Sequence, residues 1–487
     1  MNNLVIKRVA EVAEVQQAAA YRKQYKPLVL TGLAGSSKPV FFAALDVLAG
    51  EKGSIVIITP SREEIRTYRR ELNYIYPNLP MQELYPISLP RVSADTQSLE
   101  VQAGRASALR LMQGEERGIV FITAEAWQQK QLQQSCALAE KLNLAVGQEA
   151  EQQTVIERLV KIGYERTEQV DALGQFCVRG EILDVYPLNC KAPVRIEWFD
   201  QEIDAIRSFN LDNQRALDNL EEIAIAPIML EASDAWTASV FDCCSESTTI
   251  ILDEPVHVFA TLEKLAKENN AYTEELFTPE ALAAECEQTP IVAVSALGHN
   301  YMKGCAKLNV PVRPIAPYNK NIDLLTKELK NSLKAGITPI IMVTSAYKAK
   351  GLAENLHNYG LPGVYAEEAL APGSVNVMFG ELDHGFRFVK ESWELITEND
   401  IYGVQKRKRF YSKNSGQKIQ YFSDIKSGDY VVHSVYGIGR YVGVEKMLAN
   451  GIYRDFLLIM YAGNDKLYIP VEHVSMLNKY VGNEGYI

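Results

Sequence analysis

Several features that mark common classes of protein are missing from this 487-residue sequence. No apolar run approaches the roughly 20 residues that span a bilayer, and the first residues lack the apolar core of a secretory signal. The seven cysteines form no Cys-x-x-Cys pair, and the six histidines show no metal-ligand spacing. We therefore expect a cytoplasmic protein with reduced cysteines, no membrane contact and no metal site.

Positive charge is also scarce, because 50 lysines and arginines face 61 acidic residues and leave a formal net charge of −11. This balance excludes a nucleic-acid surface spread over the whole molecule, which needs clustered lysine and arginine. The local exception is the stretch 404–418, which has six basic residues and no acidic one. We interpret residues 401–425 as a basic linker whose own contact with DNA is weak at most.

What the sequence does contain is an alternation of strands, loops and helices. Short β-branched runs at 27–31, 54–59 and 118–123 each lead into a loop and a helix, which is typical of a parallel α/β layer. After about residue 150, tight turns at Arg179-Gly180 and Asp200-Gln201 separate alternating strands and indicate an antiparallel α+β domain.

The α/β pattern resumes at 248–258 and again over 300–400, and four or five short strands follow. We therefore predict a multidomain α/β and α+β protein, since single cores seldom exceed roughly 250–300 residues. The predicted parts are a degenerate P-loop NTPase-like α/β domain split into 1–119 and 209–299, an inserted antiparallel α+β domain at 120–208, a further α/β domain at 300–400, the linker at 401–425, and a small SH3/Tudor-like β-barrel at 426–487.

The loop TGLAGSSKP at 31–39 looks like a damaged phosphate-binding loop of the pattern G-x-x-x-x-G-K-[ST]. Gly32 and Lys38 keep their positions, but Ser37 replaces the second glycine and Pro39 replaces the hydroxyl residue that binds Mg²⁺. A Cβ at the glycine position obstructs the phosphate, and proline has neither a hydroxyl nor an N–H. The strand–loop–helix scaffold tolerates proline in the first turn of a helix, whereas the metal site is lost.

The strand IILDEP at 250–255 is the natural partner of this loop, because Asp253 and Glu254 resemble the acidic pair that holds Mg²⁺ and polarises water. The plain alternative is that two carboxylates at a strand end are merely solvated. We interpret Gly32, Gly35, Lys38, Asp253 and Glu254 as vestiges of a nucleotide site, and we expect no catalytic residue and no cofactor in this chain.

Three stretches together resemble one family. The segments 163–187 (GYERTEQVDALGQFCVRGEILDVYP) and 199–210 (FDQEIDAIRSFN) are similar to the second domain shared by the excision-repair protein UvrB and the bacterial transcription-repair coupling factors. The segment 380–403 (GELDHGFRFVKESWELITENDIYG) resembles the third domain of the coupling factors. Residues 428–471, with GDYVVHSVYGIGRYVGV and LLIMYAGNDKLYIPV, resemble their RNA polymerase-interacting domain, a CarD-like module.

This resemblance implies a first domain split by the inserted second one, and a DNA translocase motor that follows the polymerase-interacting domain. The sequence stops where that motor is expected to begin, so we expect a truncated, monomeric adaptor that is not itself an enzyme. The implied partners are the β subunit of RNA polymerase and the damage-recognition ATPase UvrA, in nucleotide excision repair. DNA is expected to be reached through the motor or weakly through the linker.

The resemblance also points to interface residues. In EKMLANGIYRDF at 445–456, apolar residues flank an Asn-Gly turn, where they either fill the end of the barrel or anchor an edge strand on the polymerase. The family favours the second interpretation, with Lys446, Met447, Leu448, Ile452 and Arg454 as the polymerase-binding set. For UvrA the candidates are Arg166, Phe176, Arg179 and Glu181, although an arginine that points outward at a turn is often only solvated.

Two other functions remain open. A UvrB-like, ATP-dependent DNA damage-binding protein is favoured by Lys38, Asp253 and Glu254. It is opposed by Ser37 and Pro39, and by the stretch 85–98, which lacks the tyrosine-rich hairpin of UvrB. A CarD-like transcription regulator with an unrelated N-terminal region is opposed by the RGEILDVYP segment at 179–187.

Overall fold

The computed structural model of the protein describes residues 4–24, 27–87, 89, 99–132, 141–190, 192–211, 213–228, 236–296, 305–367, 369–403, 417–418, 427–433, 437–449, 452–461, 466–470 and 477–479. The chain forms two compact units. The first comprises Met1–Leu84, Arg110–Gln129 and Val240–Lys408, and the second comprises Tyr85–Leu109, Lys130–Ser239 and Arg409–Ile487.

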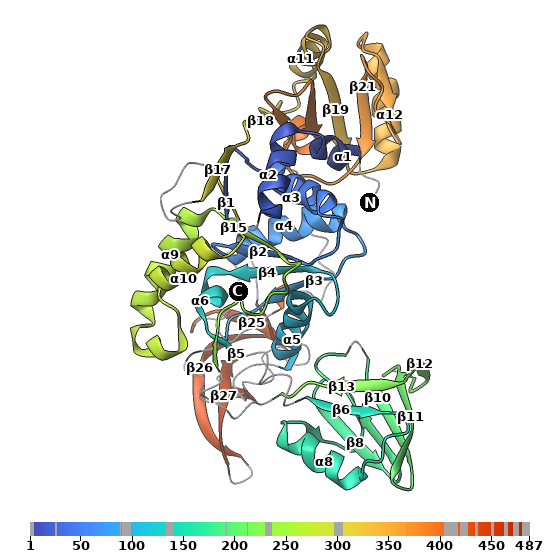
Figure 1. The fold of residues 1–487 in the computed structure, drawn as a ribbon, viewed down its shortest axis with the longest axis vertical. Coiled ribbons are helices and arrows are strands. Elements are labelled where there is room, and N and C mark those ends of the chain that lie inside the picture. The colour runs from blue at the N-terminus through green and yellow to red at the C-terminus, as the bar shows by residue number, and fades with distance from the viewer. Residues whose placement is uncertain are drawn as a thin grey trace. The chain divides into compact units, whose positions relative to one another are not determined.

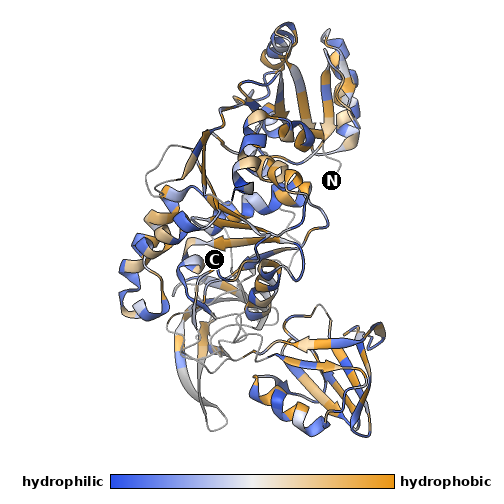
Figure 2. Ribbon diagram, in the orientation of Figure 1, coloured by the Kyte–Doolittle hydropathy of each residue, from blue (hydrophilic) through white to orange (hydrophobic). Residues whose placement is uncertain are grey.

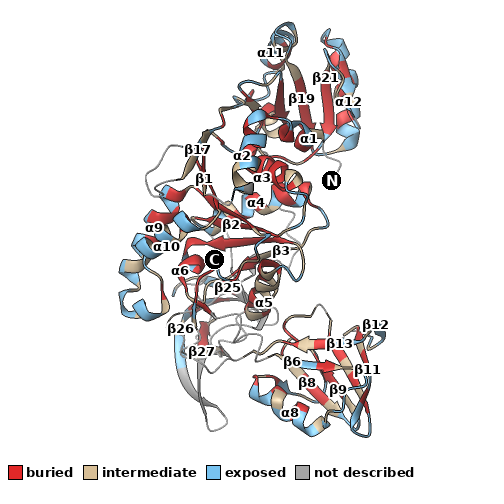
Figure 3. Cartoon of the chain, in the orientation of Figure 1, coloured by how far each residue is buried: buried red, intermediate tan, exposed pale blue. Residues whose placement is uncertain are grey.

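The first unit contains a parallel seven-stranded sheet with strand order β17-β1-β16-β15-β2-β4-β3 (Figure 1). Its strands are β1 (Leu28–Thr31), β2 (Ile55–Thr59), β3 (Met81–Leu84), β4 (Ile119–Thr123), β15 (Thr249–Asp253), β16 (Val292–Ser295) and β17 (Ala306–Asn309). Every residue of β2, β4 and β15 is buried, as expected of a parallel sheet that is covered on its faces (Figure 3). The strands predicted from the short β-branched runs are confirmed.

Helices alternate with these strands. They are α1 (Leu4–Ala10), α2 (Ala13–Lys23), α3 (Ser37–Leu48), α4 (Arg62–Ile75), α6 (Ala124–Gln128), α9 (Pro255–Glu268), the 3-10 helix η3 (Asn270–Glu275) and α10 (Pro279–Gln288). Most of α5 (Leu99–Gln113) belongs to the second unit. Helix α4 begins at a side-chain cap, because Ser61 Oγ accepts a hydrogen bond from the Glu63 N–H at 3.3 Å. We call this sheet with its helices the first α/β layer.

The places of β4 and β15 on either side of β2 show where another domain is inserted. Both strands flank β2, since Ile55 pairs with Ile119 on one side and with Thr249 on the other. The chain therefore leaves the sheet after β4 and returns to it at β15. The inserted part begins later than the boundary we predicted at residue 120, because β4 is fully buried within the parallel sheet and is followed directly by α6.

A six-stranded sheet with order β18-β22-β23-β19-β21-β20 forms a second α/β layer in the same unit. Its elements are β18 (Val312–Pro314), α11 (Ile322–Lys334), β19 (Thr338–Val343), α12 (Ala346–Asn358), β20 (Gly363–Tyr365), β21 (Val375–Phe379), β22 (Phe386–Phe388), β23 (Trp393–Thr397) and α13 (Glu398–Tyr402). Strands and helices alternate here, as the α/β pattern over 300–400 predicts. The strands β19, β21 and β23 are parallel, and β18 and β22 run antiparallel at one edge.

The two α/β layers share one hydrophobic core. Val9 of α1 and Phe41 of α3 belong to the same buried cluster as Ile340, Phe386 and Trp393 of the second sheet. Apolar residues follow the strands and the inner helix faces in this unit (Figure 2). The α/β segment after residue 300 is therefore packed onto the first layer through buried apolar surface, and the two layers form one compact unit.

The second unit contains an antiparallel domain. Its main sheet has the order β12-β11-β10-β9-β8-β7. The elements are β6 (Leu142–Ala145), α8 (Gln152–Lys161), β7 (Glu165–Arg166), β8 (Gln175–Arg179), β9 (Ile182–Val185), β10 (Val194–Phe199), β11 (Glu202–Phe209), β12 (Ala216–Leu220) and β13 (Glu222–Ile225). Both predicted hairpins are confirmed: Gly180 and Asp200 adopt φ of +62° and +58° in two-residue turns.

This domain has its own core, in which Leu159 of α8 packs with Phe176, Ile196 and Trp198 of the sheet. It continues past residue 208, our predicted boundary, because β13 pairs with β6 and adds Ile223 and Ile225 to the core. A further short pair in this unit joins β5 (Gln131–Leu132) to β14 (Trp236–Ala238).

The C-terminal residues form an antiparallel sheet with order β24-β29-β25-β26-β27-β28. Its strands are β24 (Gln417–Lys418), β25 (Tyr430–His433), β26 (Gly437–Ala449), β27 (Ile452–Met460), β28 (Lys466–Pro470) and β29 (Leu477–Lys479). Val431, Tyr441, Leu457, Ile459 and Ile469 form its core. Residues 404–416 of the basic stretch 404–418 lie outside the described residues. So do 88 and 90–98 of the stretch 85–98, which we compared with the UvrB hairpin.

Candidate functional site

The loop at 31–39, which we call the loop remnant, joins β1 to α3 as the sequence predicted. Gly32 has φ +90°, and a Cβ placed there would lie 2.5 Å from the Val310 carbonyl oxygen. Gly35 has φ +54°. The backbone itself therefore requires glycine at 32 and favours it at 35, whether or not the loop binds a ligand.

Ser37, at the position of the second glycine, closes the loop remnant on itself. Its hydroxyl accepts a hydrogen bond from the Ala34 N–H at 3.0 Å and donates one to the Ala34 carbonyl at 2.7 Å. The Ser37 and Lys38 N–H groups donate to the carbonyls of Ala34 and Gly35 at 3.3 and 3.1 Å. Because Pro39 has no N–H, the first amides of α3 are either used within the loop or absent, and they do not form an open anion cradle.

Lys38 is bound by two carboxylates, those of Asp253 at the end of β15 and of Glu254 directly after it. Its Nζ lies 2.7 Å from Asp253 Oδ1 and 2.8 Å from Glu254 Oε1, and the Lys38 side chain is only 11% exposed. Burial opposes the charge on Lys38, but the two carboxylates outweigh it and raise the pKa of the ammonium above its ordinary value. Glu254, at φ +47°, also accepts from the Ala296 N–H at 3.1 Å.

The structure thus brings the predicted vestigial residues together, and it pairs the lysine with protein carboxylates. In a working loop the same ammonium faces nucleotide phosphates.

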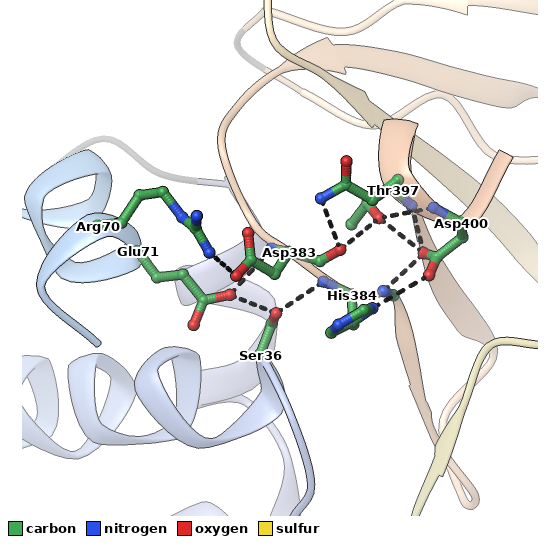
Figure 4. Close-up of polar contacts among 9 residues, drawn as sticks. Ser36, Arg70, Glu71, Asp383, His384, Thr397 and Asp400 are labelled. Carbon is green, nitrogen blue, oxygen red and sulfur yellow. Dashed lines mark hydrogen bonds and ion pairs between the residues drawn. The ribbon is translucent and has the colours of Figure 1, made fainter. Parts of the chain in front are cut away.

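The start of α3 also meets the second α/β layer (Figure 4). Ser36 Oγ donates to Glu71 Oε1 of α4 and accepts from the His384 N–H at 2.9 Å. The Asp383 N–H donates to the same Glu71 oxygen at 2.9 Å, and the Asp383 carboxylate is paired with Arg70. Glu71 is 2% exposed, so this contact is a buried polar network.

Two groups in this network are electrostatically perturbed. Burial raises the pKa of Glu71 to about 7, against the opposing effect of the Ser36 hydroxyl and of Arg70. The Asp400 carboxylate, whose Oδ1 lies 3.8 Å from His384 Nδ1, raises the pKa of the His384 imidazole above its ordinary value.

Sequence reasoning missed Ser36, Glu71, Asp383 and His384. One signal was available: Glu71 lies on the face of α4 that carries the buried residues Tyr68, Leu72 and Ile75, where a carboxylate needs a partner. Nothing in the sequence identifies that partner, because it lies more than 300 positions away along the chain.

In the antiparallel domain, Arg166, Arg179 and Glu181 are exposed, as expected of interface residues. Arg179 Nη2 donates to the Glu168 carbonyl at 3.0 Å, which holds the side chain near the β8–β9 turn. Phe176 differs from the prediction: it is 0% exposed and belongs to the core, because strand alternation turns it inward. Its side chain supports the sheet and is not available to a partner.

In the C-terminal sheet, the backbone of all five predicted polymerase-binding residues lies in the β26–β27 hairpin. Lys446, Met447 and Leu448 pair with Asp455, Arg454 and Tyr453, and Ala449 pairs with Ile452. The side chains of Lys446, Met447, Leu448, Ile452 and Arg454, and the Asn450-Gly451 turn, lie outside the described part of the chain.

Among the described residues, no three or more His, Cys, Asp or Glu side chains gather as metal ligands would. In the same part of the chain, no helix is both long and apolar enough to cross a bilayer.

Two regions match known protein families. Residues 142–230 match the family described as UvrB interaction domain, and residues 425–481 match the family described as CarD-like/TRCF RID domain. The first match covers the antiparallel domain and the second covers the C-terminal sheet. The chain is therefore a multidomain protein that carries both of these domains.

Comparison over the whole chain agrees. The chain is 28% identical over 540 aligned residues to the transcription-repair-coupling factor of Bacillus subtilis (strain 168), covering 94% of this chain and 46% of that protein. It is 22% identical to the corresponding protein of Staphylococcus epidermidis, with 94% of this chain and 45% of that protein covered. The resemblance predicted from the sequence is confirmed: the chain is homologous to transcription-repair-coupling factors over 94% of its length and spans about half the length of these relatives.

Proposed function

We propose that this chain acts as an adaptor that binds RNA polymerase through its C-terminal sheet and UvrA through its antiparallel domain, coupling stalled transcription to nucleotide excision repair. The observation that carries the proposal is that both matched domains, at 142–230 and 425–481, occur in one chain that is homologous to transcription-repair-coupling factors. This function places the protein in the cytoplasm.

The proposed UvrA surface lies at the β7–β8 edge of the antiparallel sheet. Arg166 on β7 and Arg179 at the end of β8 are exposed cations, and Glu181 lies in the adjoining turn. Charges at the rim of an interface guide orientation and the rate of association, and a charge pair that becomes buried on binding also contributes affinity. Phe176 is left out of this set because it is in the core.

The proposed polymerase surface is the far half of the β26–β27 hairpin. Among the described strands, β25 pairs with β26 only as far as Arg440, and β28 pairs with β27 only from Phe456 onward. The segments 445–449 and 452–455 therefore each have one strand edge that no described strand covers. Such an edge offers unpaired N–H and C=O groups to a partner sheet, and neighbouring side chains select the partner. We assign this role toward the β subunit to Lys446, Met447, Leu448, Ile452 and Arg454.

We propose further that the first α/β layer descends from a P-loop NTPase and no longer binds nucleotide, so that this chain has no enzyme activity and no cofactor of its own. The occupied amides of Ser37 and Lys38 and the pairing of Lys38 with Asp253 and Glu254 support this. They argue against the UvrB-like ATPase alternative. The match at 142–230 argues against a CarD-like regulator with an unrelated N-terminal region.

The experiment is a pair of binding measurements with the purified full chain. UvrA is titrated into the chain by calorimetry at low salt, and RNA polymerase is captured on the immobilised chain. We expect a complex in each case. Chemical cross-linking of the captured polymerase should join this chain to the β subunit. The absence of either complex would contradict the corresponding half of the proposal.

A further inference from the structure

A turn from the second α/β layer contacts the loop remnant at Gly35 and Ser36. We call residues Asp383–Gly385 the latch segment. The His384 N–H donates to Ser36 Oγ, and the Asp383 N–H donates to Glu71 Oε1, each at 2.9 Å. A Cβ placed on Gly35 would lie 3.7 Å from the His384 Cβ, which is van der Waals contact. The latch segment therefore touches both the loop remnant and α4, at the start of α3 (Figure 4).

The latch segment is also fixed by hydrogen bonds within the second α/β layer. Asp400 Oδ2 accepts hydrogen bonds from the Gly385 N–H at 2.7 Å and from the Thr397 N–H and Oγ1 at 2.8 Å each. The Asp383 carbonyl accepts from Asn399 Nδ2 at 3.2 Å and lies 3.2 Å from Thr397 Oγ1. A ligand that is fixed before it binds loses little entropy on binding, so this turn is preorganised for the contact.

Close packing surrounds the polar contacts. A Cβ placed on Gly380 would lie 2.7 Å from Tyr74 Oη, and the Tyr74 hydroxyl donates to the Phe379 carbonyl at 3.1 Å. Leu382, directly before the latch segment, is buried in the core that the two layers share. On the same interface, Lys390 Nζ lies 2.6 Å from Glu14 Oε1.

We propose that the latch segment is an internal ligand of the degenerate phosphate loop: it occupies the loop in place of a nucleotide and locks the two α/β layers into one rigid body. Domain interfaces within a chain are mobile by default unless they bury apolar surface. Here an apolar core and a buried polar network act together, so the loop remnant has a docking role although its phosphate site is gone. This goes beyond the adaptor function and does not depend on either binding partner.

The first test is a disulfide cross-link between Gly35→Cys and His384→Cys in the full chain. The Cβ separation of 3.7 Å at this pair falls within the range of disulfides, about 3.5–4.5 Å. The matched control joins Gly35→Cys to His357→Cys, an exposed position on α12 that is not within 4 Å of the Gly35 Cβ site. Peptide mass mapping identifies the bond among the native cysteines. We expect the 35–384 bond to form about tenfold faster than the control bond or more.

The second test does not depend on cysteine at a positive-φ position. Hydrogen exchange of peptides that cover 380–386 is measured in the wild type and in Ser36→Ala, with the peptide covering β19 as the internal control. Loss of the Ser36 oxygen should accelerate exchange at the latch segment roughly tenfold and leave β19 unchanged. Millimolar Mg-ATP should change neither peptide. Equal cross-linking rates, unchanged exchange in Ser36→Ala, or opening of the latch segment by Mg-ATP would each overturn the proposal.

Discussion

Lys38 and Asp253, 215 residues apart in the chain, form a buried ion pair in which Nζ lies 2.7 Å from Oδ1. The lysine comes from the loop remnant after β1 and the aspartate from the end of β15. A buried pair of this kind contributes little net stability when intact, but removing one partner leaves an uncompensated charge in a site of low polarity. The residue that a nucleotide-binding loop uses for phosphate therefore has a structural role in this protein.

We predict that Lys38→Met destabilises the chain by about 3 kcal/mol, because Asp253 and Glu254 lose their cation. Urea denaturation followed by circular dichroism measures this change. The double variant Lys38→Met with Asp253→Asn is the control and should recover part of the loss. No phosphate release from ATP should be detected in the wild type or in either variant. Wild-type turnover that Lys38→Met abolishes, with stability unchanged, would contradict this account.

Contact of the latch segment should weaken as pH rises. Burial raises the pKa of Glu71 from its ordinary 4.5 to about 7, so folding favours the protonated carboxyl. The corresponding stability is fully present below about pH 4.5 and is lost as pH rises through about 7. Asp400 raises the pKa of His384 within the second layer itself, so we assign the pH dependence of the contact to Glu71. Arg70 and Asp383 are the other charged groups that face this pair.

The expected size follows from linkage. Between pH 6 and 8 the Glu71 contribution alone changes the opening equilibrium of the latch segment about tenfold, toward the open state at pH 8. Hydrogen exchange of residues 380–386, corrected for the intrinsic pH dependence of exchange, measures this directly. The variant Glu71→Gln keeps an acceptor oxygen and should flatten most of the pH dependence. A protection factor that is constant from pH 6 to 8 in the wild type would refute the assignment.

Arg179→Ala should weaken the proposed complex with UvrA. Truncating one member of a hydrogen-bonded charge pair at an interface costs roughly 2–5 kcal/mol, so the affinity should fall at least about thirtyfold. The fold should be unaffected, because Arg179 is exposed and, within the described part of the chain, donates only to the Glu168 carbonyl at the domain surface. Arg215→Ala is the matched control, since Arg215 is exposed next to β12 at the opposite edge of the same sheet. Equal losses in both variants would indicate a nonspecific charge effect instead.

Leu448→Arg or Met447→Arg should abolish capture of the polymerase β subunit. A charge introduced at an anchor position must be desolvated on binding, which costs several kcal/mol. Both positions lie beyond the part of β26 that pairs with β25, so the sheet should stay folded. Tyr430→Arg is the control, because Tyr430 is an exposed apolar residue on β25. Wild-type capture by both hairpin variants would refute this placement, and loss of the far-ultraviolet signal would assign the residues to the sheet core.

The layers and hairpins of this fold were predictable because they follow from local patterns. The buried strands β2 and β4 are β-branched runs, and the turns at Gly180 and Asp200 are marked by residues that tolerate positive φ. The departure of the loop remnant from the phosphate-binding pattern is equally local, since Ser37 and Pro39 stand at defined positions of that pattern.

What could not be predicted depends on contacts between distant segments. The burial of Phe176 follows from which face of β8 packs on α8, and the residues around the β8–β9 turn do not reveal it. Glu71 and Asp383 lie 312 positions apart in the chain, and they meet only because the second layer docks on the first. Sequence patterns specify periodicity within an element, whereas register between layers is set by the shared core.

The most direct test of the adaptor function is whether one chain binds both partners at once. The full chain, RNA polymerase and UvrA are mixed without nucleotide and passed over a sizing column with light-scattering detection. The account predicts a ternary peak that contains all three, reduced to the binary polymerase complex by Arg179→Ala and to the binary UvrA complex by Leu448→Arg. A chain that binds neither partner, or that releases one when the other is added, would contradict the account.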